Sequence, residues 1–129
     1  MRIAIIALLA ACGSDPPVSM SLQLTGPSDV LITVSSDTQA ADPVMLPVSR
    51  ELTFLSYQDA IINRPLITAT HTAMTSYATA DVLCGDHVPD SVSIFFVISA
   101  TLEMFEEGSC YSDSNELCSF GPDFTNCID

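Results

Sequence analysis

The chain has 129 residues, which is enough for one domain of ordinary size. Apolar residues make up 48% of it, a share that excludes a disordered acidic tail. The chain has no lysine, three arginines and sixteen carboxylates, giving a formal net charge of −13 at pH 7. Such a surface repels nucleic acids and anionic lipid headgroups and attracts cations. We therefore expect no nucleic-acid partner.

The first residues have the layout of an export signal. Met1–Arg2 is a small positive end, and Ile3–Leu9 is an apolar run too short to cross a bilayer as a helix. The segment Leu9–Cys12, with the sequence LAAC, then resembles the lipobox of bacterial lipoproteins. In that family the small residues before the cut fit the signal peptidase, and the cysteine thiol takes a diacylglycerol.

The resemblance implies a signal peptide over residues 1–11 and a lipidated Cys12 with a tether over residues 12–17. Behind it, the pattern of alternating residues described below predicts a single β domain over residues 18–129. The resemblance also implies a lipid anchor in the cell envelope. Because Gly13 rather than aspartate follows the cysteine, a lipoprotein of a Gram-negative bacterium would go to the outer membrane. The alternatives are an ordinary signal peptide cut nearby and a buried N-terminal strand.

Alternation of apolar and polar residues predicts strands along the first half of the chain. Val18–Thr25 alternates without a break, and the turn Gly26–Asp29 joins it to a second strand, Val30–Ser35. This pair forms either a hairpin or neighbours joined across a sandwich. Two more short strands are predicted at Val44–Val48, which Pro47 confines to an edge or a bulge, and at Glu51–Tyr57.

The middle of the chain is less regular. Gln58–Pro65 is predicted as a loop or a single helical turn, and Tyr77–Cys84 as a strand or a short helix. Leu66–Met74 has threonine at every second position, which suits a strand with one solvent-facing side. Gly85–Asp90 is a loop rich in turn residues.

The longest alternating stretch is Ser91–Phe105, and we predict it as the central strand. Fifteen residues in one strand would extend close to 50 Å, so we expect this strand to bend or to end early. The alternative for its second half is a short helix, Ala100–Glu107, capped by Ser99 and stopped by Gly108.

Short strands with turns every eight to twelve residues predict an all-β fold. We expect an antiparallel β-sandwich, immunoglobulin-like in architecture although the chain has no tryptophan. A small β-barrel, or an α+β fold with one short helix, is the alternative. A disulfide-rich tail is expected over about residues 106–129.

Four cysteines remain once Cys12 is assigned to lipid, and an even number in an exported chain predicts two disulfides. Three pairings are possible. The turn residues between Cys118 and Cys127 favour a hairpin that joins these two, which leaves Cys84 for Cys110. A straight strand between Cys84 and Cys110 would hold them too far apart for a bridge. A zinc site made with His87 is the alternative, but export argues against reduced thiolates.

The two histidines are the first candidates for chemistry. His71 lies on the apolar side of its predicted strand, which favours a neutral, hydrogen-bonded core histidine. His87 lies in a loop with Asp86 and Asp90, where an exposed polar loop is favoured over a metal or base site. No spacing of Ser, His and Asp singles out a catalytic triad, and no phosphate-binding glycine loop is present.

The acidic tail is a weak candidate for calcium, since alternating oxygen ligands in a loop are what Ca²⁺ needs. The candidate ligands are Asp113, Asn115, Glu116 and Asp123. They lack the glycine and the distal glutamate of an EF-hand loop, so a solvated acidic loop is favoured and we expect no cofactor.

Two functions remain open. The first is a non-enzymatic lipoprotein whose β domain serves binding, adhesion or envelope assembly through a protein partner. The second is a lipid-anchored hydrolase or metal-dependent enzyme that uses His71 or His87 with nearby carboxylates. The enzyme hypothesis needs polar groups that converge in a pocket, and the sequence from Pro65 onward has no lysine or arginine to stabilise an anionic transition state. We therefore favour the first.

Overall fold

Strand β1 (Val18–Thr25) is an interior strand of the larger of two sheets, next to its edge strand β4. In the computed structural model, which describes residues 16–36 and 42–128, β1 is antiparallel to β4 (Val48–Phe54) and parallel to β7 (Ser91–Ile98). The strands beyond β7 follow as antiparallel hairpins: β8 (Met104–Ser112), β9 (Asn115–Gly121) and β10 (Phe124–Cys127). The order is therefore β10-β9-β8-β7-β1-β4.

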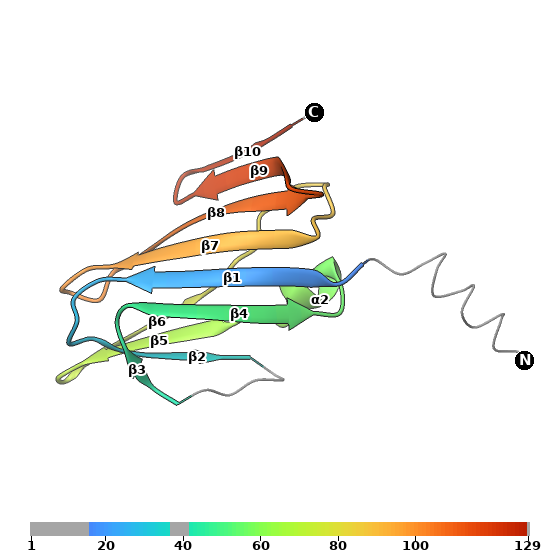
Figure 1. Cartoon of the computed structure of the whole chain (residues 1–129). Helices are drawn as coiled ribbons and strands as arrows, with labels where there is room; N and C mark the ends of the chain where they lie inside the picture. The colour runs from blue at the N-terminus through green and yellow to red at the C-terminus, as the bar shows by residue number, and fades with distance from the viewer. Residues whose placement is uncertain (1–15, 37–41, 129) are drawn as a thin grey trace, which may run out of the picture.

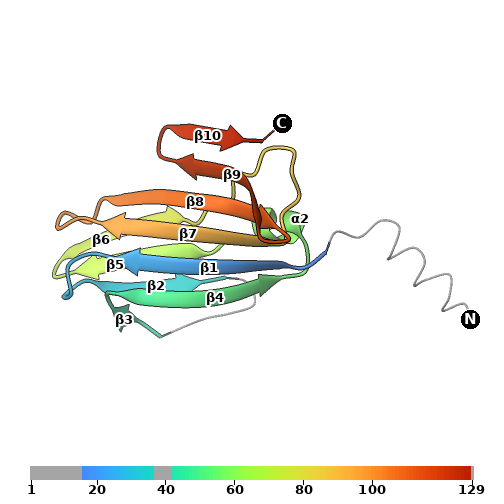
Figure 2. The same cartoon turned by 45° about the horizontal axis from the view of Figure 1, so that its top comes forward.

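The smaller sheet has four antiparallel strands and lies against one face of the larger sheet (Figure 1). Its order is β3-β2-β5-β6, with β3 (Val44–Met45), β2 (Leu31–Ser35), β5 (Leu66–His71) and β6 (Met74–Thr79). Figure 2 shows the two layers from a second direction. Both sheets are open at their edges within the described residues, so the fold is sandwich-like and the small-barrel alternative is wrong.

The core forms between the sheets because the alternating pattern places every second side chain inside. All four apolar residues of the β1 pattern are 0% exposed, and β7 buries its own set in register with them. The buried sets are Val18, Met20, Leu22 and Leu24 in β1, and Val92, Ile94, Phe96 and Ile98 in β7. At about 25 cal/mol per Å² of apolar surface, these two strands supply much of the burial that stabilises the fold.

The parallel pairing of β1 with β7 corrects the prediction of a wholly antiparallel sandwich. Strand β1 continues through the turn after Thr25 into β2 of the other sheet, so the first two strands do not form a hairpin. Since no hairpin partner pairs with this edge of β1, β7 pairs with it instead, although β7 is distant in sequence. The alternative that joined these strands across the sandwich is confirmed.

The expectation that the strand predicted over Ser91–Phe105 ends early is confirmed, and its helical alternative, Ala100–Glu107, is wrong. The strand ends at Ile98, and the chain turns back through residues 99–103 into β8. The hydroxyl oxygen of Ser99 accepts hydrogen bonds from the backbone N–H groups of Thr101 and Glu103, as a helix cap would. Leu102 has a φ of 65°, in the left-handed region, and this reverses the chain instead of starting a helix.

One short helix, α2 (Tyr57–Ile62), lies where a loop or a helical turn was predicted. Ser56 caps its N-terminus by accepting from the Asp59 N–H at 3.1 Å. The Asp59 carboxylate accepts from the Leu55 N–H at 2.9 Å and from the Asn63 side-chain amide at 2.6 Å. These two hydrogen bonds lower the pKa of Asp59. Hydrogen bonds from the residues that flank the helix therefore stabilise it.

Two other predictions change at their boundaries. The strand predicted over Val44–Val48 is divided at residues 46–47, and β3 and the start of β4 belong to different sheets. Residues 77–79 end strand β6, and residues 80–84 continue outside any strand or helix.

Candidate functional site

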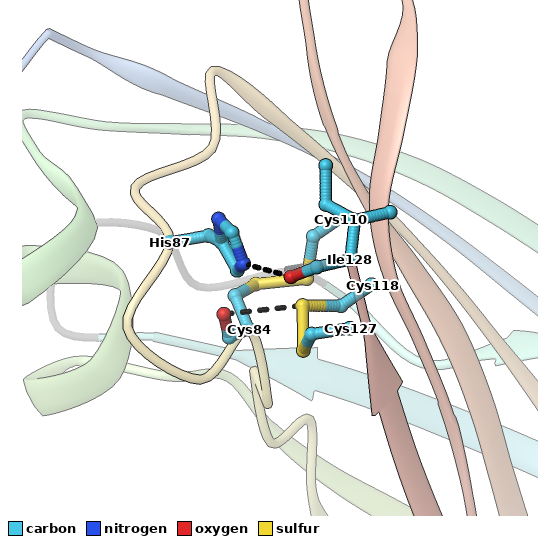
Figure 3. The surroundings of a disulfide bond; sticks show 6 residues. All are labelled: Cys84, His87, Cys110, Cys118, Cys127 and Ile128. Carbon is cyan, nitrogen blue, oxygen red and sulfur yellow. Dashed lines mark hydrogen bonds between the residues drawn. A yellow bond between two sulfur atoms is a disulfide. The ribbon is translucent and has the colours of Figure 1, made fainter.

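Two disulfides gather the C-terminal hairpins and the loop before β7 (Figure 3). Cys84 bonds to Cys110 with their Cα atoms 6.0 Å apart, and Cys118 bonds to Cys127 with theirs 4.0 Å apart. This is the pairing that the hairpin argument favoured. The Cys84–Cys110 bridge is possible because β7 ends at Ile98 and β8 returns antiparallel, which brings Cys110 opposite Val92.

The two disulfide bridges lie next to each other and in contact with α2. The Sγ atom of Cys118 lies 3.2 Å from the carbonyl oxygen of Cys84, so the two disulfides are adjacent (Figure 3). The backbone of Cys84 also hydrogen-bonds the Tyr57 hydroxyl, while burial of this phenol raises its pKa. The two disulfides and the Tyr57 hydrogen bond therefore hold α2, the loop over residues 80–90 and β10 together in one corner of the sandwich.

His87 belongs to that corner. Its Nε2 atom lies 2.8 Å from the carbonyl oxygen of Ile128 (Figure 3). The Ile128 N–H donates to the Leu117 carbonyl at 2.8 Å. A ring nitrogen that donates to a backbone carbonyl is a structural contact. It holds the chain after β10 against the loop that precedes β7.

The prediction that His71 is a core histidine is wrong. It ends strand β5 at the sandwich end opposite the disulfides, and its side chain is 28% exposed. Its Nε2 atom lies 2.8 Å from a carboxylate oxygen of Asp29, in the turn between β1 and β2. The alternation that placed His71 inward ends at the next residue, Thr72, whose φ of 53° begins the hairpin turn. The two histidines therefore serve separate contacts.

The calcium candidates do not come together. Asp113 and Ser114 form the turn between β8 and β9, both with positive φ, while Asp123 lies in the turn between β9 and β10. Strand β9 separates the two turns by roughly 20 Å at the rise of a β-strand. The Asp113 N–H also donates a hydrogen bond to Asp90 Oδ2 at 2.8 Å. Within the described residues, no three His, Cys, Asp or Glu side chains could hold a metal ion.

A carboxyl group that the sequence pattern did not single out lies on the inner face of β8. Glu106 is paired with the buried Phe96, and its Oε2 atom is buried without a hydrogen-bond partner. Burial and the nearby Asp81 carboxylate raise the pKa of Glu106 to about 8, against a hydrogen bond from the Asp81 N–H that lowers it. Asp81 itself is paired with Arg64 at 3.0 Å. In the alternating stretch Ser91–Phe105 every even-numbered residue is apolar. Continuing this pattern past Phe105 would have placed Glu106 on the inner face.

The outer face of the larger sheet has a hollow of about 240 Å³ across β7, β8, β9 and β10. We call it the outer-face hollow. It is lined by Phe95, Glu107, Gly108, Ser109, Ser119, Phe120 and Phe124. Phe95 and Phe124 are 46% and 52% exposed.

Cys12 and the predicted signal peptide lie outside the described residues. No helix among residues 16–36 and 42–128 is long and apolar enough to cross a membrane.

Comparison with known proteins adds no relative: no family model, no curated protein and no solved structure matches this chain.

Proposed function

We propose that this chain is an exported protein, anchored by lipid at Cys12 in the bacterial cell envelope, whose β domain acts as a non-enzymatic binding module. The observation that carries the proposal is the pair of disulfides, Cys84–Cys110 and Cys118–Cys127. Disulfides persist outside the reducing cytosol, so they support export of the domain that follows the lipobox. The outer membrane of a Gram-negative bacterium is the proposed location.

Two further observations support a binding role. Each histidine is engaged in a separate contact, His71 with Asp29 and His87 with the Ile128 carbonyl. The outer face of the larger sheet instead presents exposed phenyl rings beside a carboxylate, in the outer-face hollow. Exposed aromatic side chains on a rigid sheet are typical of surfaces that bind a partner.

We also infer an immunoglobulin-like architecture in the broad sense of two open sheets with strands that cross between them. The crossing of the chain from β1 to β2 and back from β3 to β4 supports this inference. An experimental structure that can be compared strand by strand with immunoglobulin domains tests it.

The tether proposed for the anchor is short. Val18 begins β1 only six residues after Cys12, and an extended chain gains at most about 3.6 Å per residue. The domain would therefore lie within roughly 20 Å of the lipid surface, with the N-terminal end of β1 facing it.

Replacement of the lipobox cysteine tests the anchor. Cys12→Ser removes the only thiol that the lipobox offers for the thioether, so the protein should move from the membrane pellet to the soluble fraction. It should also lose labelling by a fatty-acid analogue. Ser14→Ala, two residues further on, is the matched control and should keep both properties. A Cys12→Ser protein that remains labelled and membrane-bound would contradict the proposal.

A further inference from the structure

The outer-face hollow combines two phenyl rings with a carboxylate. Phe95 on β7 is paired with Glu107 on β8, and Phe124 on β10 is paired with Gly121 on β9. All four positions belong to the outer face, since they alternate with the buried Ile94 and with Gly108 and Phe120. The Glu107 carboxylate and the two exposed rings therefore lie on the same face and line the same hollow.

Gly121 allows the Phe124 ring to lie close to the sheet. A Cβ atom built on Gly121 would lie 2.4 Å from the Phe124 ring, so the ring rests directly over the glycine backbone. A side chain at this position would displace the ring. The hollow is about 240 Å³, below the ~300–1,000 Å³ of sites for drug-sized ligands, so its size suits one small head group.

The electrostatics favour a positively charged occupant. Glu107 is exposed, and no hydrogen bond or ion pair engages its carboxylate in the described part of the chain. The described residues include thirteen carboxylates, and their only permanently charged cations are Arg50 and Arg64. The field of the molecule therefore concentrates cations at its surface, and the faces of phenyl rings attract them further.

The lining also distinguishes between kinds of cation. Besides Glu107, the polar side chains are only the hydroxyls of Ser109 and Ser119. A primary ammonium group is strongly hydrated and needs three acceptors to replace its water. A quaternary ammonium group is clad in methyl groups and makes no hydrogen bonds, so aromatic faces with one nearby carboxylate satisfy it fully. The second hollow, lined by Gln23, Leu24, Thr25, Pro47, Val48 and Ser49, has neither ring nor charge.

We propose that the outer-face hollow is a binding site for a quaternary ammonium group, with Phe95 and Phe124 contacting its methyl groups and Glu107 compensating its charge. The proposal deepens the binding role proposed above and rests on it.

Choline is the probe that tests this site. The full-length, isotope-labelled chain is titrated with choline chloride by NMR, in a detergent without ammonium groups and at constant ionic strength maintained with sodium chloride. Saturable shifts are expected in the amides of residues 107–109 and 119–124. 3,3-Dimethylbutan-1-ol, the uncharged analogue with the same shape, should bind at least about fivefold more weakly because it lacks the cation.

The variants assign the contacts. Glu107→Gln keeps the shape of an exposed side chain and should weaken choline binding about fivefold, and Phe124→Leu should do the same by removing a ring face. Glu51→Gln, which removes another exposed carboxylate of the same sheet, is the matched control and should leave binding unchanged. Equal binding of the uncharged analogue, an unchanged affinity in Glu107→Gln, or tighter binding of Nα-acetyl-lysinamide than of choline would each overturn the proposal.

Failure of this site and failure of the anchor remain distinguishable. Loss of choline binding leaves the membrane partition of the Cys12 variants unaffected, and a soluble wild-type protein that still binds choline would reject the anchor alone.

Discussion

Glu106 is the residue whose chemistry fits its surroundings least. Its side chain points from β8 toward the core, with one carboxyl oxygen buried and unpaired. Burial first, and then the charge of Asp81, raise its pKa to about 8, while the Asp81 N–H opposes them. Asp81 is itself paired with Arg64. Glu106 is therefore neutral in the folded protein over a range in which it is ionised in the unfolded chain.

This difference has a definite sign. Between the ordinary pKa of 4.5 and the folded value of about 8, the folded state holds a proton that the unfolded chain has lost. The free energy of unfolding should therefore fall as pH rises from about 4.5 to about 8 and then level off. Glu106→Gln removes this contribution and should stabilise the protein at pH 8 by about 1–3 kcal/mol, after discounting for partial solvent exposure.

Urea denaturation at pH 5 and pH 8 measures the effect. The gain of Glu106→Gln over the wild type should be much smaller at pH 5 than at pH 8, whereas Glu107→Gln, on the exposed face next to it, should show no such difference. An equal effect of Glu106→Gln at both pH values would contradict the assignment of a raised pKa to this group.

At the scale of elements, the two disulfides close loops of different length, with sequence separations of 26 and 9 residues. In the chain-entropy description, the longer loop restricts the unfolded chain by about 3.5 kcal/mol and the shorter one by about 2.7 kcal/mol. Cys84 and Cys110 are also fully buried, so their loss leaves space in the core.

We therefore expect the double variant Cys84→Ala/Cys110→Ala to lose more stability than Cys118→Ala/Cys127→Ala. The second variant should chiefly expose β10 to hydrogen exchange, because the bridge fastens this edge strand to β9. Denaturation and amide exchange of both variants, with the oxidised state of the remaining pair verified by mass spectrometry, make the comparison. If Cys118→Ala/Cys127→Ala unfolds at a lower urea concentration than Cys84→Ala/Cys110→Ala, the expected order of stabilities is wrong.

The elements also show what periodicity can predict. Strand β1 has the predicted bounds, Val18–Thr25, because uninterrupted alternation encodes a half-buried strand directly. The turn over residues 99–103 escaped prediction because the alternation keeps the same parity through it: Leu102 is buried by a left-handed turn, and Glu106 then falls on the inner face of the next strand. An alternation with a period of two shows which side chains point inward, but it does not show where the chain reverses direction.

The candidate sites were less predictable than the strands, for a different reason. The parallel contact of β1 with β7, the pairing of His71 with Asp29 and the grouping of Phe95 with Phe124 in one hollow all join residues far apart in sequence. The disulfide pairing could be argued because a turn lies between Cys118 and Cys127. No comparable local signal marks the outer-face hollow.

For the whole molecule, the dominant feature is charge. Sixteen carboxylates follow the predicted signal peptide, against Arg50 and Arg64. Confined to one small surface they repel one another, and the unfolded chain relieves this repulsion by spreading them apart. Salt screens it, with a Debye length of about 10 Å at 0.1 M.

Stability should therefore rise with sodium chloride from near zero to physiological concentration, on the order of 1 kcal/mol or a few degrees in Tm. Because Asp113 and Asp123 lie at opposite ends of β9, calcium chloride of equal ionic strength should act like sodium chloride. Thermal melts in both salts test this. A Tm that does not change with sodium chloride contradicts the repulsion, and a larger effect of calcium contradicts the separation of the acidic residues.

The placement of the two chain ends in the larger sheet determines how the domain would resist tension. A pull on the N-terminal side of Val18 acts along β1, which is bonded on both edges, so β1 can leave only by shearing its ladders with β4 and β7 together. A pull on the C-terminus reaches β10, an edge strand that could otherwise be peeled away bond by bond. Cys127 lies at the end where that peeling would begin, and it is covalently joined to its cross-strand partner, Cys118. The sheet is therefore mechanically secured at both ends, by shear geometry at one and by a covalent bond at the other.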